Sequence, residues 1–422
     1  MKHVVSLRCV ICGERYAPDE VSYVCPRHGN EGILDVEYDY AAIQQQLRSG
    51  SLRLPDAAPS AGMFAYRPFL PVRSDTPEPP LLIGGTPLYD APRLAARLGI
   101  AQVWVKDDGR NPTASFKDRA SAVAIMKAHE IGAEIVTTAS TGNAAAALAG
   151  LAASVGQKTV IFVPATAPQA KIAQLLVYGA TVMLVEGSYN DAFDLCLEAT
   201  AAFGWYCRNT AYNPYMAEGK KTVVFELYDQ LTARAQPPIS HIFVSVGDGC
   251  IISGVYKGVR DLKAVGALET LPRVMGVQAA ASDYLYQAWA NDEDVLTKPP
   301  IEAGSLADSI NAGLPRDRVK AMAAVRETGG AYVRVTDEEI LAAMPALAQG
   351  CGVFAEPAAA AAYAGLVKAA ADGQVGPSDR AAVLVTGNGL KDVGAAMKAA
   401  GRAVTVKPTL AAVRRALSEL DS

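Results

Sequence analysis

The 422-residue sequence lacks the charge excess and the targeting segments that several classes of protein require. Its 39 Lys and Arg residues face 43 Asp and Glu residues, so a net charge of −4 gives no basic field for nucleic acid or an anionic membrane. The start, MKHVVSLRC, lacks the apolar core and small-residue cleavage site of a signal peptide. We therefore expect a cytoplasmic protein without nucleic-acid or membrane partners.

A convincing membrane span is also missing. Residues 135–157 carry no charge and are long enough to cross a bilayer, but they are mostly Ala, Thr, Ser and Gly around Asn143. We expect a strand, a polar loop and a buried Ala-rich helix here. Hydrophobic residues make up 50% of the chain and charged residues 19%, which is typical of a folded enzyme and excludes a disordered chain.

The seven cysteines are an odd number and fall into two groups. Near the N-terminus, Cys9-x2-Cys12 precedes Cys25-x2-His28, and two such close pairs have the spacing of a tetrahedral zinc site. We expect Cys9, Cys12, Cys25 and His28 to bind a structural zinc; a hairpin whose thiols pack without metal is the alternative. The scattered cysteines are expected to be reduced thiols: Cys196, Cys207, Cys250 and Cys351.

The rest of the chain shows an ordered alternation of segment types. Residues 53–88 are rich in proline and predict an extended surface arm. Beyond it, apolar, β-branched segments without polar alternation predict buried parallel strands joined by helices. These segments are 103–106, 135–138, 159–163, 181–185, 241–246, 273–278 and 381–386. The close-set repeats between about 133 and 208 predict a smaller sheet inserted into a larger one.

Four loops at the ends of these strands carry chemistry. In Asn111–Arg119, a Pro turn leads into a helix that Ser115 is able to cap, with Lys117 in the first turn, where the positive helix terminus lowers the pKa of an amine. Such a lysine suits Schiff-base chemistry, although most lysines at this position are simply solvated. The other loops are the polar 139–143, the glycine-rich 246–254 and the Thr-Gly turn 385–391. Together they provide a nucleophile, an anion loop, a phosphate cradle and a hydroxyl, which pyridoxal phosphate requires.

The motifs GGTPL (84–88), NPTASFKDR (111–119), STGN (140–143), EPAAAAAYAGL (356–366) and VTGNGLKD (385–392), with the glycine loop, resemble those of the tryptophan-synthase-β-like (fold type II) pyridoxal-phosphate enzymes. Within that group the chain is most similar to the threonine synthases. The resemblance implies two open, mostly parallel, doubly wound sheets with the cofactor in the interdomain cleft, plus a small N-terminal zinc-ribbon-like hairpin. It also implies a cytoplasmic enzyme of amino-acid biosynthesis, expected to be a homodimer.

The expected domains follow from these patterns and the resemblance. They are an N-terminal Cys/His segment at 1–52, the Pro-rich arm at 53–88, a large cofactor-binding domain at 89–132 and 209–406, a small inserted domain at 133–208 and a C-terminal helix at 407–422.

The resemblance also implies roles for individual residues. Lys117 binds the cofactor as a Schiff base and moves protons, and Thr386 faces the pyridine nitrogen. The cofactor is contacted by Phe116, Lys117, Asn143, Gly247, Asp248, Gly249, Cys250, Ile251 and Thr386. The amino-acid substrate is contacted by Ser140, Thr141, Asn143, Asn209 and Thr210. The implied reaction is that of a carbon–oxygen lyase acting on phosphates, which converts O-phosphohomoserine and water to threonine and phosphate.

The sequence departs from this pattern at several positions. Met216 stands where the family often has an arginine that grips the substrate phosphate, and Met cannot replace a bidentate contact. Ala144 replaces a Thr and Ala114 a Gly. Arg208 and Lys220 are candidates to compensate, but surface charges are the more ordinary interpretation.

These departures keep other hypotheses open. One is a different pyridoxal-phosphate enzyme, such as a threonine or serine dehydratase, a diaminopropionate ammonia-lyase or a cysteate-synthase-like enzyme using O-phosphoserine. Another is a catalytically silent, metal-bearing interaction protein, against which the intact Lys117, Asn143 and Thr386 argue. A nicotinamide dehydrogenase ranks lower, because the glycine fingerprint with its following acid is not found.

Overall fold

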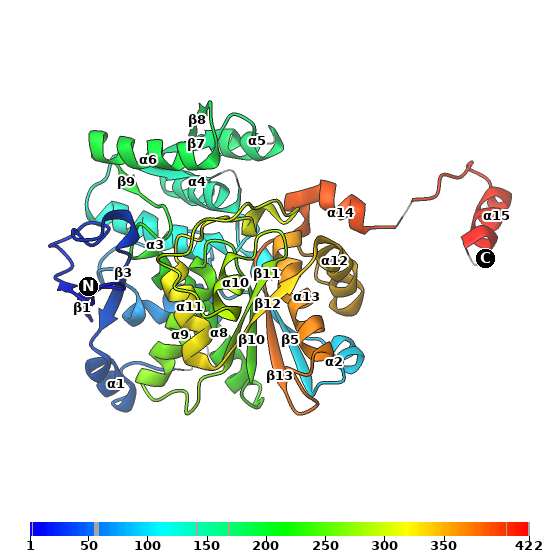
Figure 1. Cartoon of the computed structure of the whole chain (residues 1–422), viewed down its shortest axis with the longest axis horizontal. Helices are drawn as coiled ribbons and strands as arrows, with labels where there is room; N and C mark the ends of the chain where they lie inside the picture. Colours follow the sequence, from blue (N-terminus) through cyan, green and yellow to red (C-terminus); the bar gives the residue numbers. More distant parts are fainter. Residues whose placement is uncertain (2, 55–58, 141, 168, 402, 421–422) are drawn as a thin grey trace.

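The computed structural model describes residues 1, 3–54, 59–140, 142–167, 169–401 and 403–420, which form three sheets (Figure 1). The largest sheet has the strand order β12-β11-β10-β13-β5-β4, and all its pairs are parallel except β4 with β5. Its strands are β4 (Leu88–Asp90), β5 (Gln102–Asp107), β10 (His241–Ser245), β11 (Arg273–Ala279), β12 (Tyr332–Val335) and β13 (Arg380–Val385).

Helices cover both faces of this sheet, and each face has its own core (Figure 1). On one face lie α3 (Lys117–Glu130), α7 (Met216–Lys220), α8 (Thr222–Ala233), α9 (Cys250–Ala264) and α11 (Arg318–Thr328). On the other lie α2 (Pro92–Leu98), α12 (Asp337–Cys351) and α13 (Pro357–Ala371). Burial on both faces explains why the central strands read as unbroken apolar segments.

A second, four-stranded parallel sheet has the order β8-β7-β6-β9. Its strands are β6 (Ile135–Ala139), β7 (Lys158–Pro164), β8 (Thr181–Val185) and β9 (Tyr206–Cys207), and its helices are α4 (Asn143–Val155), α5 (Gln169–Val177) and α6 (Tyr189–Phe203). All seven predicted strands are therefore confirmed. The prediction of burial on both faces is wrong for β8, because this edge strand leaves Met183 and Leu184 exposed.

The N-terminal segment forms an antiparallel sheet of order β2-β1-β3, with β1 (Val4–Cys9), β2 (Arg15–Tyr16) and β3 (Leu34–Tyr38). The expected hairpin is thus extended by a third strand, β3. A buried polar network ties β3 to the main body: the Tyr38 hydroxyl donates to Glu218 over 2.8 Å, and Lys221 Nζ lies 2.5 Å from Glu218 and 2.6 Å from Asp261.

The Pro-rich segment does not form the extended surface arm that the sequence predicts. It contains the 3-10 helical stretch η2 (Pro59–Phe69), which is interrupted at Gly62 and Tyr66. Met63 and Phe69 are at most 1% exposed, because this stretch packs its apolar side chains into the main core. The many prolines fix φ for turns and leave the segment without a regular hydrophobic period. Its composition therefore did not reveal that its apolar side chains are buried.

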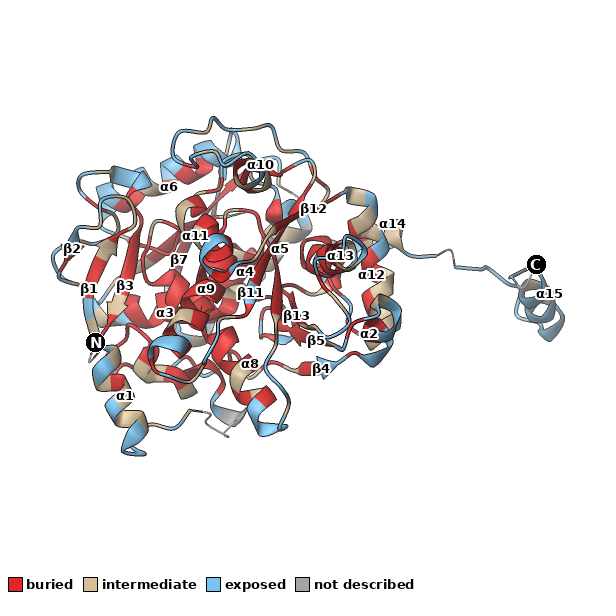
Figure 2. Cartoon of the chain, turned by 60° about the horizontal axis from the view of Figure 1, so that its bottom comes forward, coloured by how far each residue is buried: buried red, intermediate tan, exposed pale blue. Residues whose placement is uncertain are grey.

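The remaining helices are α1 (Tyr40–Arg48), α10 (Tyr284–Ala290), α14 (Val393–Ala399) and α15 (Leu410–Leu420). Of these, α10 buries Tyr284, Leu285 and Ala288 in the main core. Helix α15 stands away from the body and is exposed (Figure 2). Among the residues described, no helix has both the length and the apolar character needed to cross a bilayer.

Candidate active site

Lys117 is the first residue of α3, directly after the loop that follows β5. This loop is bonded to the loop after β13: the Phe116 N–H donates to the Thr386 carbonyl over 2.9 Å, and the Asn388 N–H donates to the Ala114 carbonyl over 3.1 Å. Ala114 has a φ of 64°, in the left-handed region that favours glycine. The lysine is therefore held at the carboxyl edge of the large sheet by a strained but well-bonded turn.

The half-buried Lys117 sits in surroundings that favour a neutral amine. Burial lowers its pKa from the usual value, and the nearby Arg208 lowers it further. The lowered pKa that the sequence predicted for Lys117 is therefore present. Its main cause is desolvation, whereas the prediction attributed it to the helix terminus. The predicted cap is wrong, because the Ser115 hydroxyl is buried without a hydrogen-bond partner. Instead, the Asp118 carboxylate accepts a hydrogen bond from the Thr113 N–H over 2.7 Å and closes the preceding turn.

Asn143 begins α4 at the edge of the small sheet, and its Nδ2 donates to Glu356 Oε1 over 2.8 Å. Glu356 is 5% exposed, and burial raises its pKa to about 7 although Lys117 acts in the opposite direction. A Cβ at Gly387 would lie 2.2 Å from Glu356 Oε1, so only glycine allows this close approach. Sequence analysis assigned Glu356 no role; its position before the Pro-Ala helix start of α13 was the available signal.

The glycine-rich loop joins β10 to the N-terminus of α9. Gly249 has a φ of 84°, and a Cβ at Gly247 would lie 2.7 Å from Ile310 Cα, so both glycines are required by the backbone. The first N–H groups of a helix have no intrahelical acceptors, and its dipole favours an anion. The loop from Gly247 to Ile251 therefore fits a phosphate group. A pyridoxal-phosphate site needs such a loop to hold the cofactor phosphate.

A pocket opens between the large-sheet and small-sheet sides of the molecule and is lined by residues of both. Asn143 and Lys171 come from the small-sheet side, and Asp308, Glu356 and Lys391 come from the large-sheet side. Lys171 Nζ lies 2.5 Å from an Asp308 carboxylate oxygen, and this ion pair joins the two sides of the pocket. A second bridge runs from Lys391 Nζ to Gln174 Oε1 over 3.3 Å.

The predicted substrate residues differ in their surroundings. The Ser140 hydroxyl is half-buried and accepts from the Gly142 N–H over 3.2 Å. Asn209 is 2% exposed, and its Oδ1 accepts from Thr138 Oγ1 over 2.8 Å and from the Ala139 N–H over 2.9 Å, which braces the end of β6. Thr141 lies outside the described residues.

Two cations that sequence analysis interpreted as surface charges are buried. Arg208 is 1% exposed and Lys220 is fully buried, so that interpretation is wrong. Arg208 Nη1 donates to the predicted substrate residue Thr210, at its Oγ1, over 3.0 Å. Met216, at the position of the missing arginine, is fully buried in the main core. Helix α7 places Met216 in the core and Lys220 beside α9.

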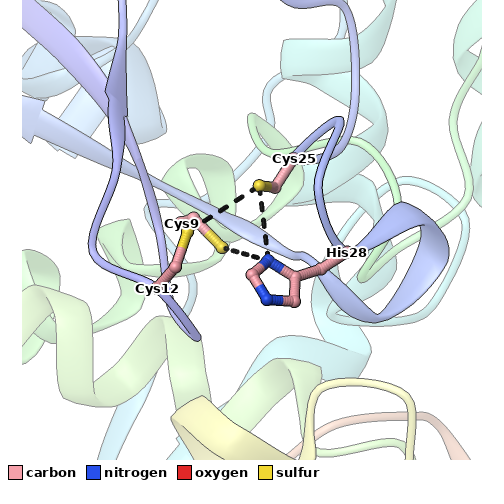
Figure 3. Close-up of side chains that lie close together, drawn as sticks. All are labelled: Cys9, Cys12, Cys25 and His28. Carbon is pink, nitrogen blue, oxygen red and sulfur yellow. Dashed lines mark hydrogen bonds between the residues drawn. The ribbon is translucent and has the colours of Figure 1, made fainter.

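The N-terminal sheet holds a separate cluster of Cys9, Cys12, Cys25 and His28, whose potential ligand atoms all lie within 4.8 Å of one another (Figure 3). Cys25 Sγ lies 3.5 Å from His28 Nδ1 and 3.9 Å from Cys12 Sγ. Ligand atoms about 2.3 Å from a tetrahedral zinc lie about 3.7 Å apart. The cluster therefore has the donor set and dimensions of a structural zinc site. All seven cysteines are free thiols.

The family model for pyridoxal-phosphate-dependent enzymes matches residues 80–387, which include Lys117, Asn143, the glycine-rich loop, Glu356 and Thr386. The chain belongs to the pyridoxal-phosphate-dependent enzyme family. The match includes Lys117, the glycine cradle and Thr386, which the sequence analysis predicted from separate loops. In the structure these loops follow the carboxyl ends of the parallel strands β5, β10 and β13.

Several relatives within the family are threonine synthases. That of Methanocaldococcus jannaschii is 35% identical over 98% of this chain and 99% of its own length. That of Methanosarcina acetivorans is 38% identical over 97% and 98%, and that of Synechocystis is 40% identical over 83% and 89%. The chain is thus a threonine-synthase-like, fold type II member of the pyridoxal-phosphate-dependent enzymes, as the sequence motifs predicted.

Solved structures agree on the fold. A threonine deaminase from Solanum lycopersicum has a TM-score of 0.62 at 22% identity and covers 75% of this chain and 83% of its own. A diaminopropionate ammonia lyase from Escherichia coli has a TM-score of 0.63 at 18% identity, with coverage of 74% and 86%. At these identities the likeness establishes the shared fold of the pyridoxal-phosphate-dependent enzymes and leaves the substrate to other evidence.

Proposed function

We propose that this protein is a threonine synthase that converts O-phosphohomoserine and water to threonine and phosphate. The observation that carries the proposal is Lys117, a lysine at the start of α3 whose pKa is lowered, near a glycine cradle at the N-terminus of α9. Full-length similarity to threonine synthases supports this substrate over the other substrates handled by the same fold.

The proposed mechanism assigns each loop a task. Bound pyridoxal phosphate would supply an electron sink that acidifies the substrate Cα and Cβ protons. Lys117 would bind the cofactor carbon and then carry protons at Nζ, because its lowered pKa makes the neutral amine accessible. The cradle from Gly247 to Ile251 would hold the cofactor phosphate through N–H groups of α9.

The polar side chains would orient the ring and the substrate. Asn143 would donate to the ring oxygen, and the Thr386 hydroxyl would face the ring nitrogen, a neutral partner that favours elimination and replacement over transamination. The Phe116 side chain is fully buried. Its backbone N–H donates to the Thr386 carbonyl, and through this bond Phe116 would help to position Thr386 against the cofactor ring. Ser140 and Thr210 lie on the small-sheet side and would bind substrate together with Thr141, while Asn209 braces the end of β6.

A product assay tests the proposal. Cofactor-loaded protein is incubated with O-phosphohomoserine, O-phosphoserine, threonine and serine, and amino acids, oxo acids and phosphate are quantified. Threonine and phosphate in equal amounts from the first compound support a threonine synthase. Oxo acid from threonine or serine alone would instead indicate a dehydratase, and turnover of O-phosphoserine alone a cysteate-synthase-like enzyme.

We also propose that the cluster of Cys9, Cys12, Cys25 and His28 binds a structural zinc ion. The ligand spacing supports this, and all four positions are filled by protein, which leaves none open for chemistry. Metal analysis of protein purified without chelator is expected to give one zinc per chain. A homodimer and a cytoplasmic location belong to the same proposal; the free thiols support the location, and light scattering tests the dimer.

A further inference from the structure

Arg208 and Lys220 are buried cations that lack an acidic partner. Arg208 follows β9, at the carboxyl edge of the small sheet, and Lys220 is the last residue of α7. Other buried cations of this chain have carboxylate partners. Arg119 contacts Asp108 and Glu226 at 2.6 Å each. Lys221 contacts Glu218 and Asp261. The contrast separates Arg208 and Lys220 from the structural ion pairs.

The hydrogen bonds of Arg208 all go to neutral oxygens. Its Nε donates to Ser121 Oγ over 3.1 Å, and its Nη1 donates to Thr210 Oγ1 over 3.0 Å. Its Nη2 reaches the Lys117 carbonyl only at 3.5 Å. Within the described part of the chain, no carboxylate oxygen lies within 4.0 Å of this guanidinium. The side chain is thus fixed in place beside Lys117 while its charge stays uncompensated.

Lys220 has even fewer contacts. Its Nζ is buried and has no hydrogen-bond partner among the described residues. A Cβ at Gly254 would lie 2.6 Å from Lys220 Cβ, which places the lysine against the second turn of α9, the helix that begins at the phosphate cradle. The nearby acid Asp317 lies 3.5 Å from Lys320, with which it is paired instead.

Most of the groups that influence the Lys220 pKa belong to the candidate active site. Burial lowers its pKa to about 7, and the acting neighbours are Cys250 of the cradle, Lys117, Arg208 and Asp317. Burial also lowers the pKa of Arg208 to about 10. A buried charge without a counter-ion is unfavourable, so an anion bound between the two side chains would stabilise both in their charged forms.

We propose that Arg208 and Lys220 form a subsite for a phosphate monoester and thereby replace the arginine that is absent at position 216. Arg208 provides planar N–H donors and Lys220 a mobile point charge, a combination that suits a dianion. The inference rests on the proposed function for its ligand, which is the phosphate of either the substrate or the cofactor. We expect the substrate phosphate to occupy this subsite, because the cradle from Gly247 to Ile251 is assigned to the cofactor phosphate.

The test uses the full-length holoenzyme and three variants. Arg208→Gln and Lys220→Met remove the charges, and Lys158→Met is the control, because Lys158 is a 71% exposed lysine on β7. Inorganic phosphate is titrated while thermal unfolding is followed. Affinity of the cofactor-free protein for pyridoxal phosphate and for pyridoxal, which lacks the phosphate, is then measured by visible absorbance.

Either of two results supports the subsite. A tenfold or greater loss of phosphate affinity by the holoenzyme variants, with unchanged cofactor affinity, assigns the pair to the substrate phosphate. A tenfold or greater loss of affinity for pyridoxal phosphate but not pyridoxal assigns it to the cofactor phosphate. If both quantities stay within twofold of wild type, the proposal is wrong. Neither readout requires turnover, so a failed proposed function and a failed subsite give different results.

A stability measurement guards against a misfolded variant. Without phosphate or cofactor, Lys220→Met is expected to unfold at a higher temperature than wild type, because it removes an unpaired buried charge. A lower unfolding temperature would show that Lys220 is a structural residue and would overturn its assignment. Should Arg208→Gln fail to fold, Arg208→Lys retains the charge without the planar fork and is expected to show an intermediate phosphate affinity.

Discussion

The Asn143 side-chain amide donates to Glu356 Oε1 over 2.8 Å, a bond between residues 213 positions apart. Asn143 begins α4, a helix of the small sheet, and Glu356 directly precedes α13, a helix of the large sheet. The bond therefore fixes the predicted ring-oxygen donor across the cleft before any ligand binds. Pre-organisation of this kind avoids an ordering cost at the time of binding.

Replacing Lys117 with alanine is expected to abolish both the absorbance of the covalently bound cofactor and threonine formation. The expectation follows from its neutral-prone amine at the start of α3. Absorbance spectroscopy and a product assay on the same preparation check it. Lys391→Ala is the matched variant, a pocket lysine outside this loop that is expected to keep the absorbance band. Retention of the band and of turnover in Lys117→Ala would remove that residue from the mechanism.

Glu356 predicts a specific pH dependence of stability. Its folded pKa of about 7 lies above the ordinary value, so its contribution to stability is full at low pH and is lost as pH rises through 7. Glu356→Gln cannot ionise, so the cofactor-free variant is expected to gain stability over wild type between about pH 5 and pH 8, by an amount on the order of 3 kcal/mol. Urea unfolding across this range measures the difference. A difference that is constant with pH would show that Glu356 is not held neutral by its surroundings.

Ala114 predicts a stabilising substitution. At a φ of 64°, Ala114→Gly relieves left-handed strain and is expected to stabilise the protein by up to about 1 kcal/mol. The control, Ala153→Gly, lies on the exposed side of α4 and is expected to cost about 1 kcal/mol. Chemical denaturation of the three proteins tests the opposite signs. Destabilisation by Ala114→Gly would mean that the turn is not strained.

The cysteine cluster predicts coupling between zinc and the active-site loops. Ile33 of the N-terminal segment packs in one cluster with Ala211 and Cys250, and the Tyr23 hydroxyl accepts from the Cys207 N–H over 2.9 Å. Chelation or Cys12→Ser is expected to remove the metal, lower the unfolding temperature and weaken cofactor retention. Melting curves with and without added zinc measure this. Cys351→Ser, outside the cluster, is the control; equal melting of wild-type protein with and without zinc would contradict a structural role for the metal.

The sequence predicted the parts of this molecule that depend on local pattern. Apolar segments marked the buried strands, and loops at their ends marked Lys117, Asn143 and the glycine cradle. The short strands β9 and β12 were missed, because two to four residues carry too little periodicity.

The missed site residues depend on tertiary context. A lysine in the sequence Glu-Gly-Lys-Lys-Thr gives no sign that Lys221 is paired in the core while Lys220 is buried alone. Similarly, nothing local to Glu356 shows that it meets Asn143. Burial of a charged side chain is decided by what packs around it, and that information lies in distant segments of the chain.

The central claim is that phosphate leaves by carbon–oxygen cleavage and that water adds to the substrate carbon. The most direct test is turnover of O-phosphohomoserine by the holoenzyme in ¹⁸O-labelled water, with both products analysed by mass spectrometry. The account predicts threonine that carries the label in its hydroxyl group and phosphate that is released unlabelled. Labelled phosphate with homoserine, or no reaction despite a bound cofactor, would contradict it.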